Sequence, residues 1–234
     1  MEVQRIKDHI HACTEFEGAN VACINTDLGV VLVDTPMLPN DIEQWKKYVL
    51  DLNPKGVRYI ISTHHHFDHV LGHHRFEGAV IMHERSIGEM IRDGGALKET
   101  MMAMAPPALT REDLDYMASA PPVSPEIEMG DALTLNLGDC RIRMLHIPGH
   151  TPDSICVYLP EDRVLITGDT LPANRHPYKG HANFSDWIKS LGRMNELDVE
   201  TIIPGHGEVC GRDEMARCRE YFHRLWFMLS LIHI

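Results

Sequence analysis

The chain has 234 residues, of which 44% are hydrophobic and 24% charged, a balance that excludes a disordered, collagen-like or disulfide-scaffold protein. It carries 22 basic and 34 acidic residues, a formal net charge of −12, and no long block of lysine and arginine. This charge argues against nucleic acid as a partner, because a phosphate backbone would be repelled.

Short apolar runs alternate with turn residues in the first half of the chain. Residues 21–25 and 30–33 flank a glycine-containing turn and indicate a β-hairpin, and residues 57–62 indicate a buried strand. Between them, residues 41–52 carry apolar side chains at helical spacing. A strand, a helix and a strand are therefore expected in this half.

The segment 92–129 is rich in methionine and proline and has a helical stretch at 111–118. Because methionine fills irregular gaps, one interpretation is an inserted helical hairpin that packs on the core. The other is an apolar lid over the active site, and the two are compatible.

The second half of the chain also alternates strands and helices. Strands are predicted at 132–137, 141–147, 154–159, 164–167 and 199–203. Helices are predicted at 187–197 and 212–231. Two strand-rich halves that each carry helices favour an α/β protein in which two sheets pack face to face, with helices outside, in a single domain over residues 1–234.

Several features bear on location and association. The first residues lack the apolar core of a secretory signal, and no apolar run has membrane-spanning length. Six scattered cysteines without a Cys-x-x-Cys pair are typical of reduced thiols, so a cytoplasmic protein that does not bind membranes is expected. The apolar residues 226–234 complete a core helix, form an association surface between copies, or are a non-native addition.

Histidine is unusually frequent, with 16 copies beside only 6 phenylalanines and 6 tyrosines. Four of the possible metal ligands follow the predicted strand 57–62, namely His64, His66, Asp68 and His69. In a strand-end loop, His64 and His66 can point the same way, while Asp68 and His69 add further donors. Imidazole and carboxylate suit zinc, manganese or iron. The alternative is an exposed polar loop without a metal, in which four such donors would occur at this spacing only by chance.

This His-x-His-x-Asp-His pattern resembles the signature of the metallo-β-lactamase superfamily. The remaining motifs of that superfamily occur in the same order, as Pro148-Gly149-His150-Thr151, Thr167-Gly168-Asp169-Thr170 and Pro204-Gly205-His206-Gly207. Each later motif is weak alone, but together they make a specific set that covers most of the chain. The resemblance implies a four-layer αββα sandwich and a binuclear Zn²⁺ centre.

The resemblance also implies how the ligands are shared. The two ions would be bound by His64, His66 and His150 on one side and by Asp68, His69 and His206 on the other. Asp169 would bridge them. Asp34, at the end of an early strand, would support the ligands from behind, unless it only caps a turn.

Two divalent ions roughly 3.5–4 Å apart lower the pKa of a shared water from about 15.7 towards about 7. A hydroxide that bridges the metals is thus the expected nucleophile, and Asp68 is expected to orient it and pass on a proton. Mn²⁺ or Fe²⁺ could replace Zn²⁺.

The other histidines are expected to have surface or structural roles, with His65 pointing away from the ligands. The loop 172–183 is different, because it follows the bridging aspartate and carries polar side chains. Its His176, Tyr178 and His181 are candidate substrate contacts, unless the loop is merely solvated.

Members of the superfamily hydrolyse many kinds of bond with the same metal core, so the core does not identify the substrate. Departures from the motifs of individual members restrict the choice. Asp169 stands where lactamases of the cysteine-ligand type place cysteine. Glyoxalase II has an appended helical domain, whereas only about 28 residues follow His206 here, and lactone hydrolases place a tyrosine where this chain has Leu171 and Pro172. We expect a hydrolase that cleaves an ester, thioester, lactone or lactam bond in a small molecule, with β-lactamase or phosphodiesterase activity as the alternative.

Two other classes of function are weighed against this one. An iron-dependent oxidoreductase is disfavoured, because the diiron flavoproteins of the superfamily place glutamate where His66 stands. A non-catalytic zinc module is disfavoured because structural zinc sites are closed and usually rich in cysteine. The oligomeric state stays open.

Overall fold

β-branched runs in the first half of the chain form one mixed sheet in the computed structural model, which describes residues 1–95, 99, 102–103 and 109–232. Its strands, in spatial and chain order, are β1 (Gln4–Lys7), β2 (Ile10–Cys13), β3 (Val21–Thr26), β4 (Gly29–Val33), β5 (Val57–Ile61), β6 (Ala79–His83) and β7 (Ile127–Met129). Strands β1 to β4 are antiparallel neighbours, and β4 to β7 are parallel. The expected hairpin and buried strand are confirmed, while β1, β2, β6 and β7 are additional.

The second half forms the other sheet. Its strand order is β13 (Cys210–Gly211), β12 (Thr201–Pro204), β11 (Val164–Gly168), β10 (Ile155–Leu159), β9 (Cys140–His146) and β8 (Ala132–Leu137). All neighbours are antiparallel except β11 and β12, which are parallel. The five strands predicted here are confirmed to within two residues.

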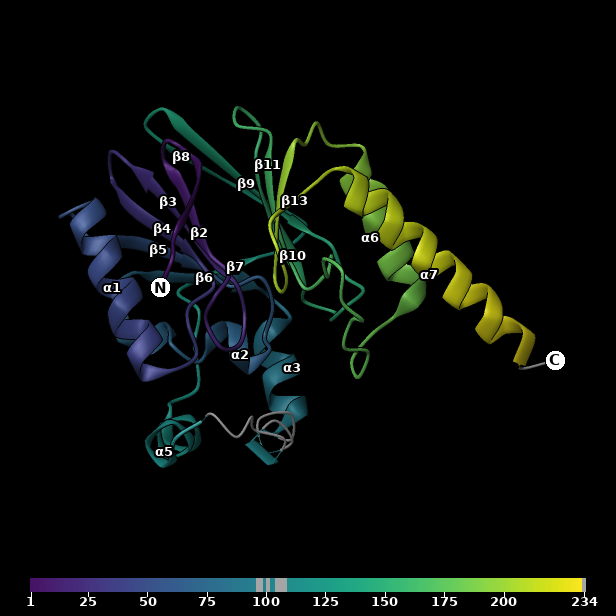
Figure 1. Ribbon diagram of the computed structural model, residues 1–234, viewed down its shortest axis with the longest axis horizontal. Coiled ribbons are helices and arrows are strands. Elements are labelled where there is room, and N and C mark those ends of the chain that lie inside the picture. The colour runs from purple at the N-terminus through teal and green to yellow at the C-terminus, as the bar shows by residue number, and fades with distance from the viewer. Residues whose placement is uncertain (96–98, 100–101, 104–108, 233–234) are drawn as a thin grey trace.

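The two sheets face each other across one apolar core (Figure 1). Ile24 and Ile61 of the first sheet and Val157 and Ile166 of the second belong to the same buried cluster. Burial of this apolar surface drives the pairing of the sheets.

Helices cover both outer faces. Helix α1 (Pro39–Leu52) buries Trp45 against the first sheet. Helices α6 (Phe184–Asn195) and α7 (Asp213–Ile232) cover the second sheet, where the ring centroids of Trp187 and Phe222 lie 4.4 Å apart. The αββα sandwich expected from the sequence is therefore confirmed.

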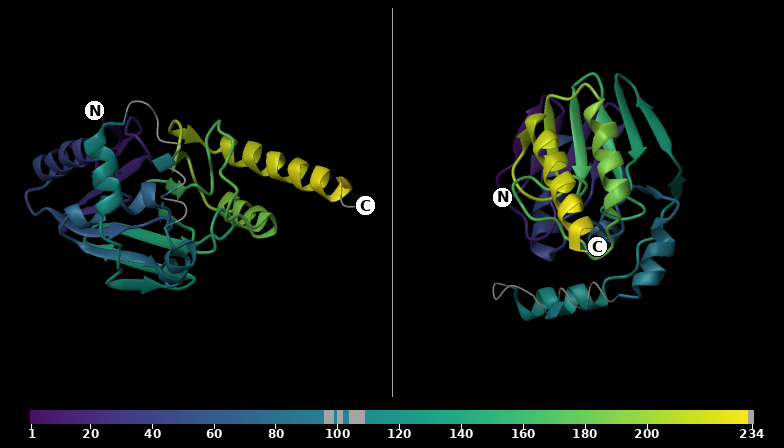
Figure 2. Two further views of the ribbon diagram at one scale, coloured as in Figure 1. Left: turned by 90° about the horizontal axis from the view of Figure 1, so that it is seen from below. Right: turned by 90° about the vertical axis from the view of Figure 1, so that its right-hand side faces the viewer.

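Local capping sets where the helices begin. Helix α1 starts at Pro39. Proline is tolerated there because N–H groups in the first turn of a helix have no acceptor within the helix, so the absence of one costs no hydrogen bond. Helix α6 starts three residues before the expected position because the Asn183 side chain accepts a hydrogen bond from the Asp186 N–H. Figure 2 shows the end of α7 extending beyond α6. Among the helices of the described residues, none has both the length and the apolar character that a membrane crossing requires.

The Met/Pro-rich segment lies partly outside the described residues. Its described parts include the end of α3 (Ser86–Asp93), α5 (Arg111–Ser119) and β7. Thr110 and Asp113 cap α5 reciprocally, and Met117 packs with Phe67 of α2 (Phe67–Val70) in a small apolar cluster beside the sandwich. Ile127–Met129 pair with β6 and so belong to the first sheet. The inserted part of the Met/Pro-rich segment therefore ends before residue 127. The lid interpretation stays a prediction.

Strand direction brings the motif-bearing loops to one edge. Parallel β4 and β5 both end there, as do β9, β11 and β12 of the other sheet. Backbone hydrogen bonds join the sheets at this edge, from Ile155 N to Thr63 O at 2.8 Å and from Asn20 N to Gly205 O at 2.7 Å. Segments far apart in sequence therefore share one site.

Candidate metal centre

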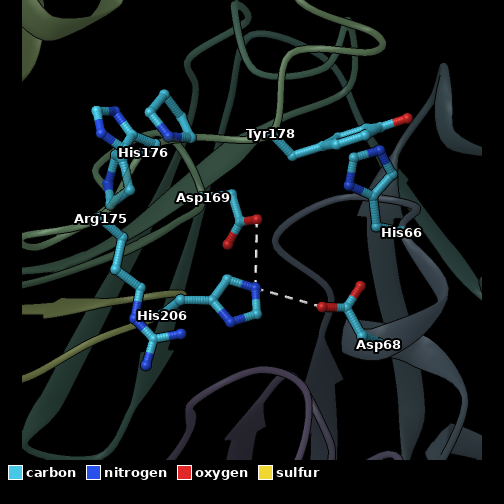
Figure 3. Close-up of a pocket in the computed structure, with 9 residues that line it drawn as sticks. His66, Asp68, Asp169, Arg175, His176, Tyr178 and His206 are labelled. Atoms are coloured by element: carbon cyan, nitrogen blue, oxygen red, sulfur yellow. Dashed lines mark ion pairs between the residues drawn. The ribbon is translucent and has the colours of Figure 1, made fainter. Parts of the chain in front are cut away.

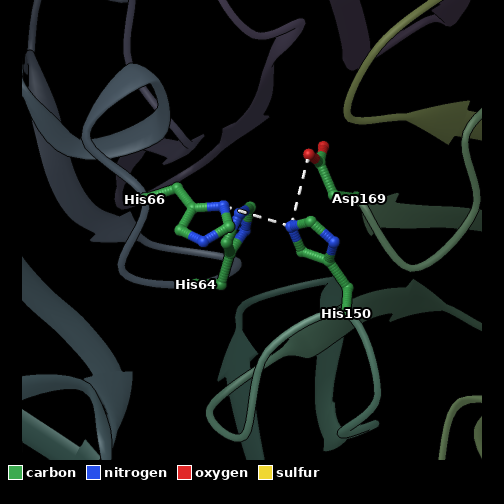
Figure 4. Close-up of side chains that lie close together, drawn as sticks. All are labelled: His64, His66, His150 and Asp169. Carbon is green, nitrogen blue, oxygen red and sulfur yellow. Dashed lines mark hydrogen bonds and ion pairs between the residues drawn. The ribbon is translucent and has the colours of Figure 1, made fainter. Parts of the chain in front are cut away.

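Three histidines and an aspartate converge at this edge (Figure 4). His150 Nε2 lies 3.1 Å from His66 Nδ1 and 3.5 Å from Asp169 Oδ2. The possible ligand atoms of His64, His66, His150 and Asp169 all lie within 4.8 Å of one another. This is the first of the two ligand groups expected from the sequence.

The second expected group lies beside the first (Figure 3). Asp68 Oδ2 is 3.3 Å from His206 Nε2 and 3.7 Å from His69 Nε2. Asp169 reaches this group as well, with 3.3 Å from Oδ1 to His69 Nε2 and 3.4 Å from Oδ2 to His206 Nε2. The Asp169 carboxylate thus lies between the two groups, where a bridging ligand would have to be.

Unpaired buried atoms indicate that these groups suit cations. His64 Nε2 is buried without a hydrogen-bond partner among the described residues, and the buried His69 Nε2 and Asp169 Oδ1 face each other at 3.3 Å without a well-formed hydrogen bond. Buried polar atoms are nearly always partnered, because desolvation without a partner is costly. Borderline-to-hard nitrogen and oxygen donors that point at a common space fit divalent metals such as zinc.

Asp34 fixes the orientation of His69 from behind. Its backbone has a left-handed φ of 56°, a strained conformation for aspartate. Its carboxylate accepts hydrogen bonds at 2.8 Å from Thr63 N, Thr63 Oγ1 and His69 Nδ1. Because Asp34 holds a proton on Nδ1, Nε2 is the nitrogen of His69 that faces the cluster and would bind an ion. Asp34 thus lies behind His69, and its supporting role in a metal centre stays a prediction.

Thr63 orients the neighbouring imidazole of His64 in the same way. Its hydroxyl proton goes to Asp34, so its oxygen accepts from His64 Nδ1 at 3.1 Å. The tautomer that results leaves His64 Nε2 without a proton. One buried network therefore orients an imidazole of each group.

The sequence suggested that Asp68 and His69 lie in an extended strand-end loop, but the structure shows otherwise. They lie on α2, a single helical turn that follows the extended residue His66. Neighbouring side chains leave a helix about 100° apart, so the two ligands approach the cluster from different directions. The pattern of one four-residue turn is too short to be read from periodicity.

Glycines allow the strand ends to approach closely. Gly168 has φ 49°, and a Cβ built there would lie 2.6 Å from Thr63 Cβ. At Gly149, with φ 151°, a Cβ would lie 2.3 Å from Trp187 Cα. These positions carry Asp169 and His150 to the site, so any side chain there would push the ligands apart.

Burial keeps the first group ready for a cation. It lowers the pKa of His64 and His66 well below the ordinary value and lowers the pKa of His150 to about 4. Neutral imidazole is the form that binds metals. These three side chains can therefore accept an ion without first losing a proton.

The second group behaves in the opposite way. Burial opposes a charge on His206, but Asp169 and Asp68 outweigh it and raise the pKa of His206 to about 10. The pKa of His69 is likewise raised, against its burial, by Asp169, Asp34 and Asp68. Binding of a cation here would have to displace protons.

A cavity of about 240 Å³ opens onto the cluster. It is lined by His66, Asp68, Asp169, Pro172, Arg175, His176, Pro177, Tyr178 and His206. Of the expected substrate contacts, His176 and Tyr178 are among these residues. His181 is not, and instead its Nδ1 lies 3.0 Å from His66 Nε2.

Most of the remaining histidines have structural partners. His73 is buried between Ser62 Oγ at 2.6 Å and Thr35 Oγ1 at 2.9 Å, and the His83 and His146 rings stack at 3.9 Å. His233 lies outside the described residues. His65 points to Asp153 and is buried, which residue spacing alone did not predict.

Comparisons with known proteins identify a family whose model matches most of this chain. The family model described as the metallo-beta-lactamase superfamily matches residues 14–206. The linear primary-alkylsulfatase of Pseudomonas sp. is 27% identical over 222 residues, and the match covers 80% of this chain and 41% of that protein. The acyl-coenzyme A thioesterase MBLAC2 of Gallus gallus is 29% identical over 166 residues, 67% of this chain and 59% of that protein. The chain thus spans between two fifths and three fifths of these two relatives.

Solved structures share the fold at low identity. A metallo-beta-lactamase from Pontibacter korlensis superimposes with a TM-score of 0.75 at 16% identity, covering 95% of this chain and 98% of that one. A sec-alkylsulfatase from Pseudomonas sp. gives 0.78 at 17% identity, covering 99% of this chain and 43% of that one. At such identities the likeness concerns the fold alone.

Proposed function

This chain belongs to the metallo-β-lactamase superfamily, and on that premise we propose that it is a binuclear zinc hydrolase that cleaves an ester, thioester, lactone or lactam bond in a small molecule. The observation that carries the proposal is the meeting of the seven predicted side chains around buried, unpaired nitrogen and oxygen atoms. The donor set contains imidazole and carboxylate without thiolate, which suits Zn²⁺ and also admits Mn²⁺ or Fe²⁺.

Each group of side chains would hold one ion. His64, His66 and His150 would bind the first, His69, His206 and Asp68 the second, and Asp169 both. When bound, the ions would supply Lewis acidity and a water acidic enough to attack at neutral pH.

Asp68 is the side chain best placed to handle the proton. It lines the cavity, and the neighbouring His69 and His206 lower the pKa of its carboxyl to about 2 in spite of burial. An ionised carboxylate at this place can orient the attacking water and accept its proton. The proton can then pass to the leaving group.

The loop 172–183 supports an anionic substrate. Arg175 lines the cavity and places a guanidinium group there, although the chain as a whole has a net charge of −12. Tyr178 lies on the His66 side of the cavity, with ring centroids 5.7 Å apart, and offers an aromatic wall. We therefore propose an ester or thioester that carries a negative group near the bond to be cleaved.

A substrate panel tests the proposed function. Zinc-loaded protein is assayed with aryl esters, acyl-coenzyme A thioesters, lactones, a β-lactam, a phosphodiester and an alkyl sulfate, the last because of the sulfatase relative. We expect turnover of an acyl substrate that disappears on chelation and in His66→Ala. The matched control is Asp162→Asn, which alters a His–Asp pair remote from the centre and should keep full activity.

Other outcomes would redirect the assignment. Turnover only of the β-lactam or the phosphodiester would favour the alternative hydrolases. One iron per chain with oxygen uptake would favour an oxidoreductase. Activity that survives exhaustive chelation would contradict any metal mechanism.

We further propose that the enzyme works in a reducing compartment such as the cytoplasm. All six cysteines are free thiols, and five of them are buried. Association between copies stays a prediction, supported by Trp226, Phe227 and Met228 on α7, which are about half exposed or more.

A further inference from the structure

A second set of histidines adjoins the binuclear centre. His65 comes from the strand-end loop, His181 from the loop 172–183, and His66 belongs to both constellations. The possible ligand atoms of these three residues lie within 4.8 Å of one another, with His66 Nε2 only 3.0 Å from His181 Nδ1. We call this set the outer histidine triad.

The outer triad is spaced like the first ligand group. Its ring centroids are 4.8, 5.2 and 5.5 Å apart, whereas those of His64, His66 and His150 are 4.5, 4.8 and 4.8 Å apart. Three imidazoles that bind one ion at about 2.0–2.1 Å hold their rings roughly 5 Å apart. The triad therefore satisfies the same spacing condition as the centre beside it.

His65 is oriented as a ligand. Its Nδ1 donates to Asp153 Oδ1 at 2.8 Å, and Asp153 Oδ2 accepts from Ser86 Oγ at 2.8 Å. The residue is only 5% exposed, and its Nε2 is buried without a hydrogen-bond partner among the described residues. A carboxylate on one ring nitrogen with the other left open is the arrangement that Asp34 gives His69.

The surroundings also supply negative charge. Asp153 is fully buried behind His65, and Asp93 Oδ1 lies 3.7 Å from His181 Nε2. His66 can serve both constellations, because Nδ1 faces His150 and Nε2 faces His181. Binding through both nitrogens releases the Nε2 proton to solvent and leaves an imidazolate, whose charge offsets part of that of an added cation.

We propose that the outer histidine triad is a third metal site, for a late first-row transition metal such as Zn²⁺ or Cu²⁺. An ion there ties the loop 172–183 to the strand-end loop and holds Tyr178, whose ring lies 6.1 Å from that of His181, over the cavity. The site goes beyond the proposed function and does not depend on which bond the enzyme cleaves.

The test counts ions in the whole protein. Metal-free protein is titrated with Zn²⁺ and dialysed against a weak chelator, and bound metal is measured by mass spectrometry. We expect three ions per chain in the wild type and two in His181→Ala, whose side chain is partly exposed and can be removed without opening the core. His176→Ala, in the same loop but outside the triad, should keep three.

His65 is buried, so its replacement is chosen to preserve the fold, and a second measurement is added. His65→Gln, which keeps a polar group beside Asp153, should also bind two ions with an unchanged circular dichroism spectrum. Cu²⁺ added to protein with two Zn²⁺ should give an electron paramagnetic resonance spectrum with nitrogen couplings, and this spectrum should be lost in His181→Ala.

Three results would overturn the proposal. They are two ions in the wild type, a third ion that persists in both triad variants, or a Cu²⁺ spectrum that His181→Ala leaves unchanged. In the first case His181 only accepts a hydrogen bond from His66. Failure of the substrate panel would leave the ion count intact, so the two proposals fail separately.

Discussion

Asp34→Asn should weaken metal binding while sparing the fold. Asparagine has nearly the shape of aspartate, but it offers one accepting oxygen and one donating amide. If the oxygen stays on Thr63 N, the amide faces the His69 Nδ1 proton, where the carboxylate now accepts at 2.8 Å. His69 must then move its proton to Nε2, the atom that would bind the ion.

The size of the effect follows from this tautomer change. Loss of an outer partner of a metal-binding histidine costs about 10–100-fold in affinity, which is about 1.4–2.7 kcal/mol. Asp34→Ala should lose similar affinity and also destabilise the metal-free protein by about 1–3 kcal/mol or more, because it strands buried donors of Thr63 and His69.

Competition with a fluorescent chelator measures the affinity, and urea unfolding of metal-free protein measures the stability. Asp162→Asn is the control, since Asp162 pairs with His9 at 3.2 Å away from the centre. Zn²⁺ binding by Asp34→Asn as tight as that of the wild type, or an equal loss of Zn²⁺ affinity in Asp162→Asn, would refute the role of Asp34.

Asp68→Ala should lower kcat/KM on the best substrate by about 10²-fold or more with an unchanged circular dichroism spectrum, because the carboxylate lines the cavity. Gly168→Ala should lower the free energy of unfolding in urea by about 2 kcal/mol or more, because its Cβ would lie 2.6 Å from Thr63 Cβ at φ 49°. In metal-free protein, stability due to His206 should be complete below about pH 6.5 and lost as pH rises through about 10, because Asp169 and Asp68 raise its folded-state pKa against burial. Urea titrations at pH 6 and pH 10 measure this loss, and metal affinity should tighten over the same rise in pH.

Each of these predictions has an outcome that contradicts it. An Asp68→Ala enzyme with wild-type turnover would remove the carboxylate from the mechanism. A Gly168→Ala protein as stable as the wild type would mean that the strand end can move. Equal urea midpoints at pH 6 and pH 10 would show that His206 does not gain its proton on folding.

Local patterns determined a large part of this protein. Apolar runs with turn signals located β3, β4, β5 and most of the second sheet, and helical spacing located α1, α6 and α7. Four of the seven expected ligands are recognisable because they lie within six residues. Short elements such as β1 and α2 escaped, because their four residues form no continuous apolar run and hold too few periods to distinguish a strand from a turn.

The tertiary structure alone decided how distant residues meet. His150, Asp169 and His206 reach the His64 loop because the strands that carry them end at one edge, which is a matter of sheet order and direction. The contacts of Asp34 with His69, of His65 with Asp153 and of His66 with His181 span 35, 88 and 115 residues. No periodicity encodes such pairs, since they arise only when burial of the apolar faces brings the two sheets together.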